Sequence, residues 1–162
     1  MPRPISIEDF MCVSLLSDPQ IAPDESRIAL VKRYTDPEKS RYQSEIWIVP
    51  TFEGEPRCFV SQEGSNTSPR WSPDGSKLAY LSTRAGKPQI FVRWMDSGAE
   101  ARITDLETAP SSLSWSPSGD RLAFLARVPA KPSWSIKMPA APAGATWADA
   151  PVVETRLKWR AD

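Results

Sequence analysis

One ten-residue phrase occurs three times in this chain of 162 residues, and this repetition restricts the possible folds more than any other feature. The copies read IAPDESRIAL at 21–30, WSPDGSKLAY at 71–80 and WSPSGDRLAF at 115–124. Trp71 and Trp115 lie 44 residues apart, and Ile21 precedes Trp71 by 50 residues. A period of about 40 to 50 residues is typical of proteins that stack one supersecondary unit repeatedly. The sequence therefore predicts a repeat protein.

The second halves of the first two units also agree. Residues 45–57 match residues 89–102 when one gap is allowed, and Ile46 and Ile90 are again 44 residues apart. The first unit is six residues longer, and the extra residues fall in the mixed-charge stretch 32–45. We interpret this stretch as a solvated loop, because alternating charge favours water and a loop insertion costs little free energy.

The second unit divides into four short strands, at residues 68–71, 77–82, 89–94 and 101–104. The first two are joined by a Ser-Pro-Asp-Gly turn, in which proline presets φ and Gly75 can adopt a positive φ. Glu25 stands where the other copies have Gly75 and Gly119. Since a positive φ is costly for glutamate, we expect the first turn to be of a different type. Ser118 replaces Asp74 in the third copy, a mild exchange between two turn-forming residues.

The second strand of each unit is apolar on both faces. In KLAYLS at 77–82, Leu78 and Tyr80 point one way while Ala79 and Leu81 point the other. A strand of this kind lies between two layers. A parallel α/β sheet would need helices for those layers, and the sequence offers no helical period to supply them. Antiparallel sheets stacked face to face satisfy the pattern instead.

Four-stranded units of about 40–45 residues stacked around an axis form a β-propeller. Alanine recurs at the centre of the second strand, at positions 29, 79 and 123, and suits a close approach of neighbouring sheets. We therefore expect an all-β chain, a partial β-propeller of four-stranded antiparallel blades, with about three blades in this chain. Its predicted segments are a lead-in (1–20), three blade repeats (21–67, 68–110 and 111–151, the last with a Pro- and Ala-rich connection) and the start of a further blade (152–162).

A short N-terminal helix is predicted at residues 6–12. Ser6 and Asp9 have the spacing of a capping box, in which each residue satisfies a backbone N–H of the other. The first 16 residues contain no apolar run long enough for a signal peptide or a membrane span. We therefore expect a cytoplasmic protein.

Charge and cysteine content narrow the function classes. Net charge is zero, from 20 basic and 20 acidic residues, which argues against nucleic acid or an anionic membrane as the main partner. Cys12 and Cys58 have no C-x-x-C spacing, and we interpret them as unpaired structural thiols. No metal ligand set and no cofactor is expected.

Catalytic machinery is missing from the sequence. The chain has no histidine and no G-x-S-x-G motif, so it cannot build a Ser-His-Asp relay by itself. The Asp74-Gly75 pair could suggest a calcium loop, but Ser76 and Lys77 add no carboxylate, and Ca²⁺ takes about six to eight oxygen ligands. We therefore interpret Asp74 as part of a structural turn.

Two further groups of residues are weak candidates for binding. Trp94 and Trp134 could line a peptide path, but tryptophan in such a fold more often packs in the core or at an interface. Arg33, Arg41 and Glu45 lie in the longer first unit and could face another domain or subunit. We assign no catalytic, metal-binding, cofactor-binding or substrate-binding residue in this chain.

Several segments resemble, in order, the TolB-like (PD40-type) propeller. More narrowly, they resemble the start of a prolyl-oligopeptidase-family (S9) serine peptidase of the acylaminoacyl-peptidase type. They are residues 7–31, 44–59, 68–92, 112–128 and 153–162, and the early DPQIAPD and the late RLKWRAD favour the peptidase. The resemblance implies a longer protein in which this propeller gates peptide access to an α/β-hydrolase domain. That domain carries the Ser-Asp-His triad and is absent from this chain.

Two function classes follow. In the first, the chain is the non-catalytic propeller part of such a peptidase; its partners are the remaining blades, the hydrolase domain, a peptide substrate and further copies in a homo-oligomer. In the alternative, it is a TolB-like propeller segment that binds a protein partner and has no enzymatic activity. Because a propeller needs about 4–8 blades to close, we expect this chain to be one piece of a larger or cleaved enzyme.

Overall fold

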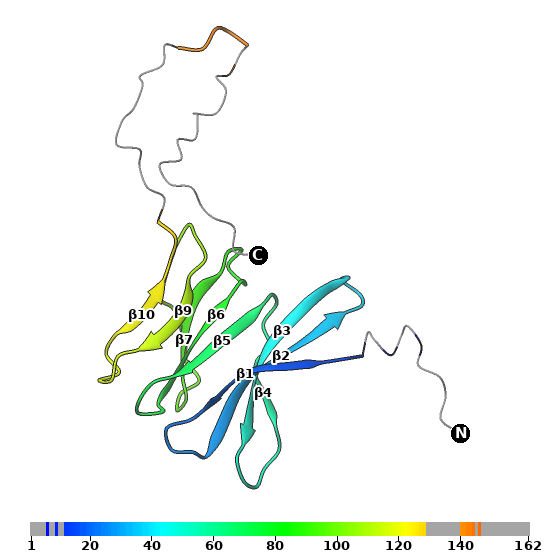
Figure 1. The fold of residues 1–162 in the computed structure, drawn as a ribbon, viewed down its shortest axis with the longest axis vertical. Coiled ribbons are helices and arrows are strands. Elements are labelled where there is room, and N and C mark those ends of the chain that lie inside the picture. The colour runs from blue at the N-terminus through cyan, green and yellow to red at the C-terminus, as the bar shows by residue number, and fades with distance from the viewer. Residues whose placement is uncertain (1–5, 7–8, 10–11, 129–139, 145, 147–162) are drawn as a thin grey trace, which may run out of the picture. The chain divides into compact units, whose positions relative to one another are not determined.

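The computed structural model describes residues 6, 9, 12–128, 140–144 and 146. The chain divides into two compact units, Met1–Val128 and Pro129–Asp162. All the strands of the described residues lie in the first unit (Figure 1).

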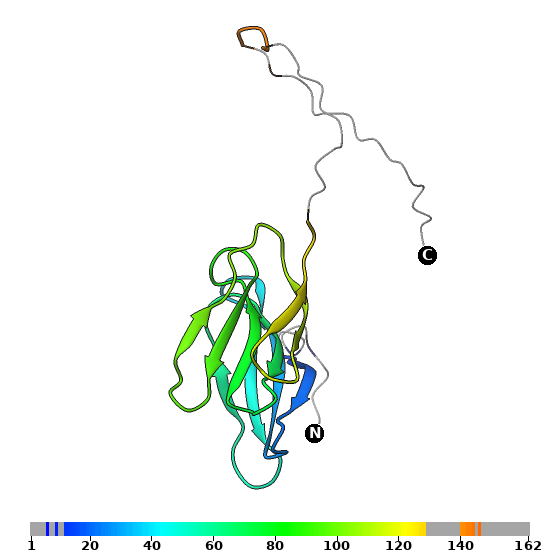
Figure 2. The same cartoon turned by 90° about the vertical axis from the view of Figure 1, so that its left-hand side faces the viewer.

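Three antiparallel sheets make up this unit (Figures 1 and 2). The first contains, in spatial order, β1 (Leu15–Ile21), β2 (Arg27–Asp36), β3 (Arg41–Pro50) and β4 (Arg57–Val60). The second contains β5 (Asn66–Trp71), β6 (Lys77–Ser82), β7 (Gln89–Trp94) and β8 (Glu100–Arg102) in the same order. The third pairs β9 (Ser111–Trp115) with β10 (Leu122–Leu125). The predicted all-β fold of four-stranded, propeller-type sheets is confirmed.

Strand bounds follow the sequence closely in the second sheet and less closely in the first. β6 and β7 have the predicted bounds, and β5 begins two residues earlier than predicted. β1 begins at Leu15, so the first sheet starts within the segment that the sequence assigns to the lead-in.

The predicted N-terminal helix falls mostly outside the described residues, which omit positions 7, 8, 10 and 11. Of the predicted cap, the Ser6 amide donates to Asp9 Oδ2 at 2.8 Å. The Asp9 amide also donates to the Ser6 carbonyl and the Cys12 amide to the Asp9 carbonyl, both at 3.2 Å. Because the other residues of this segment lie outside the described part of the chain, the helix stays a prediction.

The three repeated turns share one geometry. In each, the fourth residue donates its amide to the carbonyl of the first: Glu25 to Ala22, Gly75 to Ser72 and Gly119 to Ser116, all at 2.9 Å. The φ angles of Glu25, Gly75 and Gly119 are 58°, 69° and 72°. The prediction of a different first turn is therefore wrong. The paired strands on either side impose the left-handed conformation on Glu25 despite its steric cost.

The mixed-charge stretch 32–45 is a hairpin, and its interpretation as a solvated loop is wrong. β2 and β3 stay paired from Arg27↔Pro50 to Asp36↔Arg41. The turn that follows is closed by Asp36, whose Oδ1 accepts from the amides of Glu38 and Lys39 at 3.1 and 3.2 Å. Cross-strand pairing satisfies the backbone here, so the extra residues lengthen the strands.

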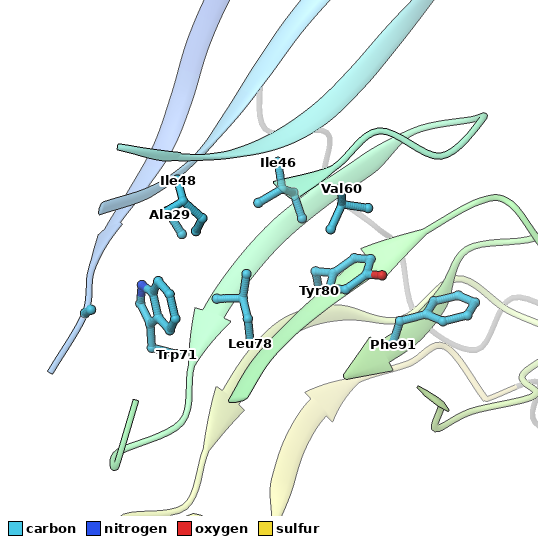
Figure 3. Close-up of a cluster of buried hydrophobic side chains, with 9 residues drawn as sticks. Ala29, Ile46, Ile48, Val60, Trp71, Leu78, Tyr80 and Phe91 are labelled. Atoms are coloured by element: carbon cyan, nitrogen blue, oxygen red, sulfur yellow. The ribbon is translucent and has the colours of Figure 1, made fainter. Parts of the chain in front are cut away.

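The core lies between the first and second sheets (Figure 3). The side chains of Ala29, Ile46, Ile48 and Val60 project from the first sheet toward those of Trp71, Leu78, Tyr80 and Phe91 on the second. Both faces of β6 are buried, because Leu78, Ala79 and Tyr80 all have no exposed area. This confirms that the strand lies between two layers. Ala29 and Ala79 are both fully buried between sheets, as a close approach would require.

The outward face of the third sheet is open in this unit. Ala123 is exposed although Ala29 and Ala79, its counterparts in the first two sheets, are fully buried. Leu125 on the same face of β10 is 65% exposed. The apolar pattern of the second strand is therefore the same in all three sheets, but its burial depends on the presence of a following sheet.

Candidate functional site

The first strands of the three sheets, β1, β5 and β9, lie next to one another and form the hub of the unit. Each contains the same bulge, in which two residues face one residue of the partner strand. The first bulged residue has a positive φ in every case: 50° at Asp18, 56° at Ser68 and 53° at Ser112. Bulges of this kind re-aim side chains and are common next to functional sites.

An ion pair joins the first two hub strands. Arg70 Nη1 donates to both carboxylate oxygens of Asp18, at 2.9 and 3.0 Å. Gln20 Nε2 donates to Asp18 Oδ1 at 3.1 Å. The side chains of Arg70 and Asp18 are 28% and 30% exposed, so the pair borders solvent.

Two indoles repeat one contact between successive sheets. Trp71 Nε1 donates to the Gln20 carbonyl at 3.0 Å, and Trp115 Nε1 donates to the Arg70 carbonyl at the same distance. Each repeated tryptophan thus ties its own sheet to the first strand of the sheet before it. We call this contact the indole tie.

A groove of about 360 Å³ lies along the hub strands and the repeated turns. Its lining combines polar side chains with the two tying indoles and with apolar side chains that include Ile21 and Leu113: Gln20, Ile21, Arg70, Trp71, Leu113, Ser114 and Trp115. We call it the hub groove. Its guanidinium, amide, hydroxyl and aromatic groups can contact an extended chain, and its residues include no nucleophile–base pair.

The second and third repeated turns are stabilised by hydrogen bonds between their own side chains and backbone. Asp74 accepts from the Ser72 hydroxyl at 2.6 Å and from the amide and hydroxyl of Ser76 at 3.1 and 2.7 Å. These bonds, first that from Ser72, hold the pKa of the Asp74 carboxyl well below its usual range. In the third turn Asp120 takes over the role of the missing aspartate and accepts from the hydroxyls of Ser116 and Ser118. The geometry supports the interpretation of Asp74 as a turn residue.

The other candidates from the sequence do not meet at the hub. Trp94 is half-buried on β7, away from the inner strands, and Trp134 lies outside the described residues. Arg33 stacks on Tyr42, and Arg41 pairs with Glu63. Glu45 accepts from the Tyr34 hydroxyl and from the Trp47 indole.

The sequence did not identify the hub residues as a site. Asp18 and Arg70 are 52 positions apart, and neither lies in a recognised motif. A usable signal was the alignment of the repeats, which places Gln20, Arg70 and Ser114 at one position, directly before Ile21, Trp71 and Trp115.

Metal and membrane features were searched in the described part of the chain. There, no group of three or more His, Cys, Asp or Glu side chains could hold a metal ion. The same residues include no helix with the length and apolar character needed to cross a membrane. Both cysteines, Cys12 and Cys58, are free and exposed.

Comparison with known proteins gives two kinds of relative. The uncharacterized peptidase YuxL of Bacillus subtilis is 37% identical over 107 residues, which cover 65% of this chain and 16% of that protein. The Tol-Pal system protein TolB of Pseudomonas aeruginosa is 45% identical over only 40 residues, or 25% of this chain and 9% of that protein. The chain thus spans a small part of the relatives that it matches.

Among solved structures, the acylaminoacyl peptidase of Pyrococcus horikoshii superposes with a TM-score of 0.59 at 25% identity. The match covers 70% of this chain and 17% of the peptidase. Residues 10–140 match the family described as the TolB beta propeller domain, PD40. Its four-stranded sheets repeat the same turn, bulge and indole tie along the chain. The chain belongs to the TolB beta propeller domain family.

Proposed function

We propose that this chain is the non-catalytic propeller part of a serine peptidase of the prolyl-oligopeptidase family. In this proposal the propeller gates the access of peptides to an α/β-hydrolase domain on a further segment of the parent protein. The observation that carries it is the length of the peptidase match. It runs over 107 residues, more than two repeats, whereas the TolB match spans 40 residues, about the length of one repeat.

The hub groove supports a gating role. The first strands of the sheets converge there, and in a closed ring such strands line the axis. The lining includes the polar side chains of Gln20, Arg70 and Ser114, and the Asp18–Arg70 pair beside it spans two blades. A narrow polar passage admits an extended peptide and excludes a folded protein. The remaining blades are therefore the partners that complete the passage.

The experiment uses the parent protein. A fluorophosphonate reagent is expected to label one serine outside residues 1–162, because this chain has no histidine to activate a serine. Hydrolysis of N-acylated peptides is expected to slow steeply with substrate length. A parent protein that is not labelled and cleaves nothing would support the binding-module alternative. Equal rates on short peptides and on folded proteins would contradict gating.

The proposal includes a cytoplasmic, homo-oligomeric parent protein with no cofactor. Light scattering of the purified parent protein tests the oligomer, and cell fractionation tests the compartment. A monomer, or a protein recovered outside the cytoplasm, would remove that part of the proposal and leave the gating role standing.

A further inference from the structure

Every complete sheet in this unit starts and finishes at the same end, because it has four antiparallel strands. The repeated turns lie at the other end, which we call the motif rim. The turns stack there: a Cβ placed on Gly75 would lie 3.6 Å from Pro23 Cδ, and one on Gly119 would lie 3.4 Å from Pro73 Cδ. The opposite end, the hairpin rim, holds the start of β1, the end of β10 and the β2–β3 turn (Figure 1).

The β2–β3 hairpin is longer than its counterpart in the second sheet. It has ten residue pairs, from Arg27↔Pro50 to Asp36↔Arg41, whereas β6 and β7 have six, from Lys77↔Trp94 to Ser82↔Gln89. The two hairpins begin at equivalent positions on the motif rim. Between these positions the first hairpin has 24 residues (27–50) and the second 18 (77–94), six more in all. The first therefore extends about three residues further along each strand, or roughly 10 Å at about 3.3 Å per residue. We call residues 33–44 the hairpin arm.

The arm is braced against the connection between β4 and β5. Glu63 Oε1 accepts from Lys39 Nζ at 2.7 Å and from Arg41 Nη2 at 2.6 Å. The Gly64 amide donates to Gln43 Oε1 at 3.3 Å. A projection that is already held in one orientation loses little conformational entropy when it binds.

The arm also presents a side-chain pair suited to the centre of an interface. The Arg33 guanidinium lies 4.3 Å from the centroid of the Tyr42 ring. Tyr42 is 66% exposed, and Arg33 is exposed as well. Tyrosine and arginine are enriched among the residues that contribute most to protein–protein binding. A stacked pair offers a flat apolar surface with hydrogen-bond donors at its edge.

We propose that the hairpin arm docks on the domain that is joined to the propeller at the hairpin rim. This inference rests on the proposed function, under which that domain is the α/β-hydrolase domain. A domain connected through the first or last strand of a blade is tethered at this rim, because those strand ends lie there. The arm projects from the same rim beyond the neighbouring hairpin, and thereby sets the distance between the propeller and the domain.

Hydroxyl-radical footprinting of the parent protein tests the docking. Tyr42 on the arm is compared with Phe52, which is 85% exposed at the β3–β4 turn on the motif rim. Docking is expected to slow oxidation of Tyr42 several-fold relative to Phe52, after correction for the intrinsic reactivity of the two rings. Oxidation of both at the rates that their exposure predicts would overturn the inference.

Amine-reactive cross-linking adds the identity of the partner. Lys39, exposed at the tip of the arm, is expected to form links to the hydrolase domain, and the half-buried Lys77 at the motif rim is the control. Links to that domain from Lys77 instead of Lys39 would overturn the inference, as would links joining Lys39 of two copies. If the cross-linking contradicts the docking but the fluorophosphonate reagent still labels a serine, only this inference fails. If no serine is labelled, the proposed function fails as well.

Discussion

Glu25 is the residue at which the first repeated turn departs from the other two. It adopts the left-handed φ of 58° that glycine supplies at positions 75 and 119. A left-handed conformation costs a non-glycine residue roughly 1–2 kcal/mol, and glycine avoids this cost. Glycine also loses more conformational entropy on folding, which offsets part of the advantage. The first repeated turn therefore has the same conformation as the other two, but Glu25 lowers the free energy of unfolding.

Replacing Glu25 with glycine is expected to raise the free energy of unfolding by about 0.5–1 kcal/mol, as measured by urea denaturation. The matched change in the opposite direction is Gly75→Ala, which is expected to lower it by about 1 kcal/mol, since its φ is 69°. A destabilised Glu25→Gly variant would show that the carboxylate of Glu25 has a role of its own.

Asp74 is expected to make stability depend on pH. Its pKa is depressed in the folded state, first by the Ser72 hydroxyl and then by Ser76. A depressed carboxyl pKa contributes stability above the unfolded pKa of about 4, and this contribution is lost as pH falls toward the lower folded value. The stability advantage of the wild type over Asp74→Asn should therefore be largest at neutral pH and shrink below about pH 4.

Melting curves of both proteins from neutral to acidic pH provide the measurement. Ser72→Ala is the control, because it removes the strongest donor while keeping the carboxylate, and it should flatten the dependence. A gap between wild type and Asp74→Asn that stays constant across the range would contradict the assignment.

At the scale of the element, the indole tie links each blade to the one before it. Trp71→Phe keeps an aromatic ring but removes the donor and part of the indole, so it is expected to cost at least about 1 kcal/mol of unfolding free energy. Trp71→Ala also leaves a cavity in the core and is expected to cost about 3–5 kcal/mol. Urea denaturation of the two variants separates the hydrogen bond from the packing. A Trp71→Phe variant as stable as the wild type would mean that the bond to the Gln20 carbonyl contributes nothing.

The central alanines give a matched pair for testing the blade faces. Ala79 is fully buried between two sheets, whereas Ala123 is exposed. Ala79→Leu is expected to overpack the junction and to cost about 1–3 kcal/mol, whereas Ala123→Leu should be nearly neutral in this chain. Thermal unfolding compares the two. A large loss from Ala123→Leu would show that its face is covered in solution.

The strands that could be predicted from the sequence are those marked by a local pattern of apolar and turn-forming residues. β6 and β7 matched because their apolar character is unbroken and the turns on either side contain glycine. The long β2–β3 hairpin was missed, because its alternating charges hide the strand pairing, which is held by backbone hydrogen bonds between residues distant in sequence. The hub bulges were missed for a different reason. The residues with positive φ there are aspartate at position 18 and serine at positions 68 and 112. Unlike glycine, neither residue type predicts a positive φ.

At the scale of the whole molecule, the unit exposes surfaces that resemble its own interior. Exposed large apolar side chains include Leu16, Ile21 and Leu125, each at least 64% exposed. The face that carries Leu125 is equivalent to the buried face of the second sheet. Exposed apolar surface of this kind favours association.

The isolated chain is therefore expected to associate as its concentration rises, which analytical ultracentrifugation can follow. Leu125→Lys should weaken the association, because it places a charge on the open face. The control is Phe52→Lys, which changes an exposed apolar residue at the motif rim. Association that is insensitive to Leu125→Lys would place the contact elsewhere.

Every junction between neighbouring sheets reuses the same parts: an indole that donates to the previous hub strand and a glycine that packs on the previous turn's proline. Tandem duplication of one 44-residue segment, such as 71–114, would thus insert a blade and add one junction, between the second sheet and its own copy. The copied Trp71 and Gly75 would supply the indole tie and the turn contact at that junction. Such a gene duplication would carry both contacts with it. The number of blades can therefore change in evolution by whole units, and a protein engineer could lengthen the array in the same way.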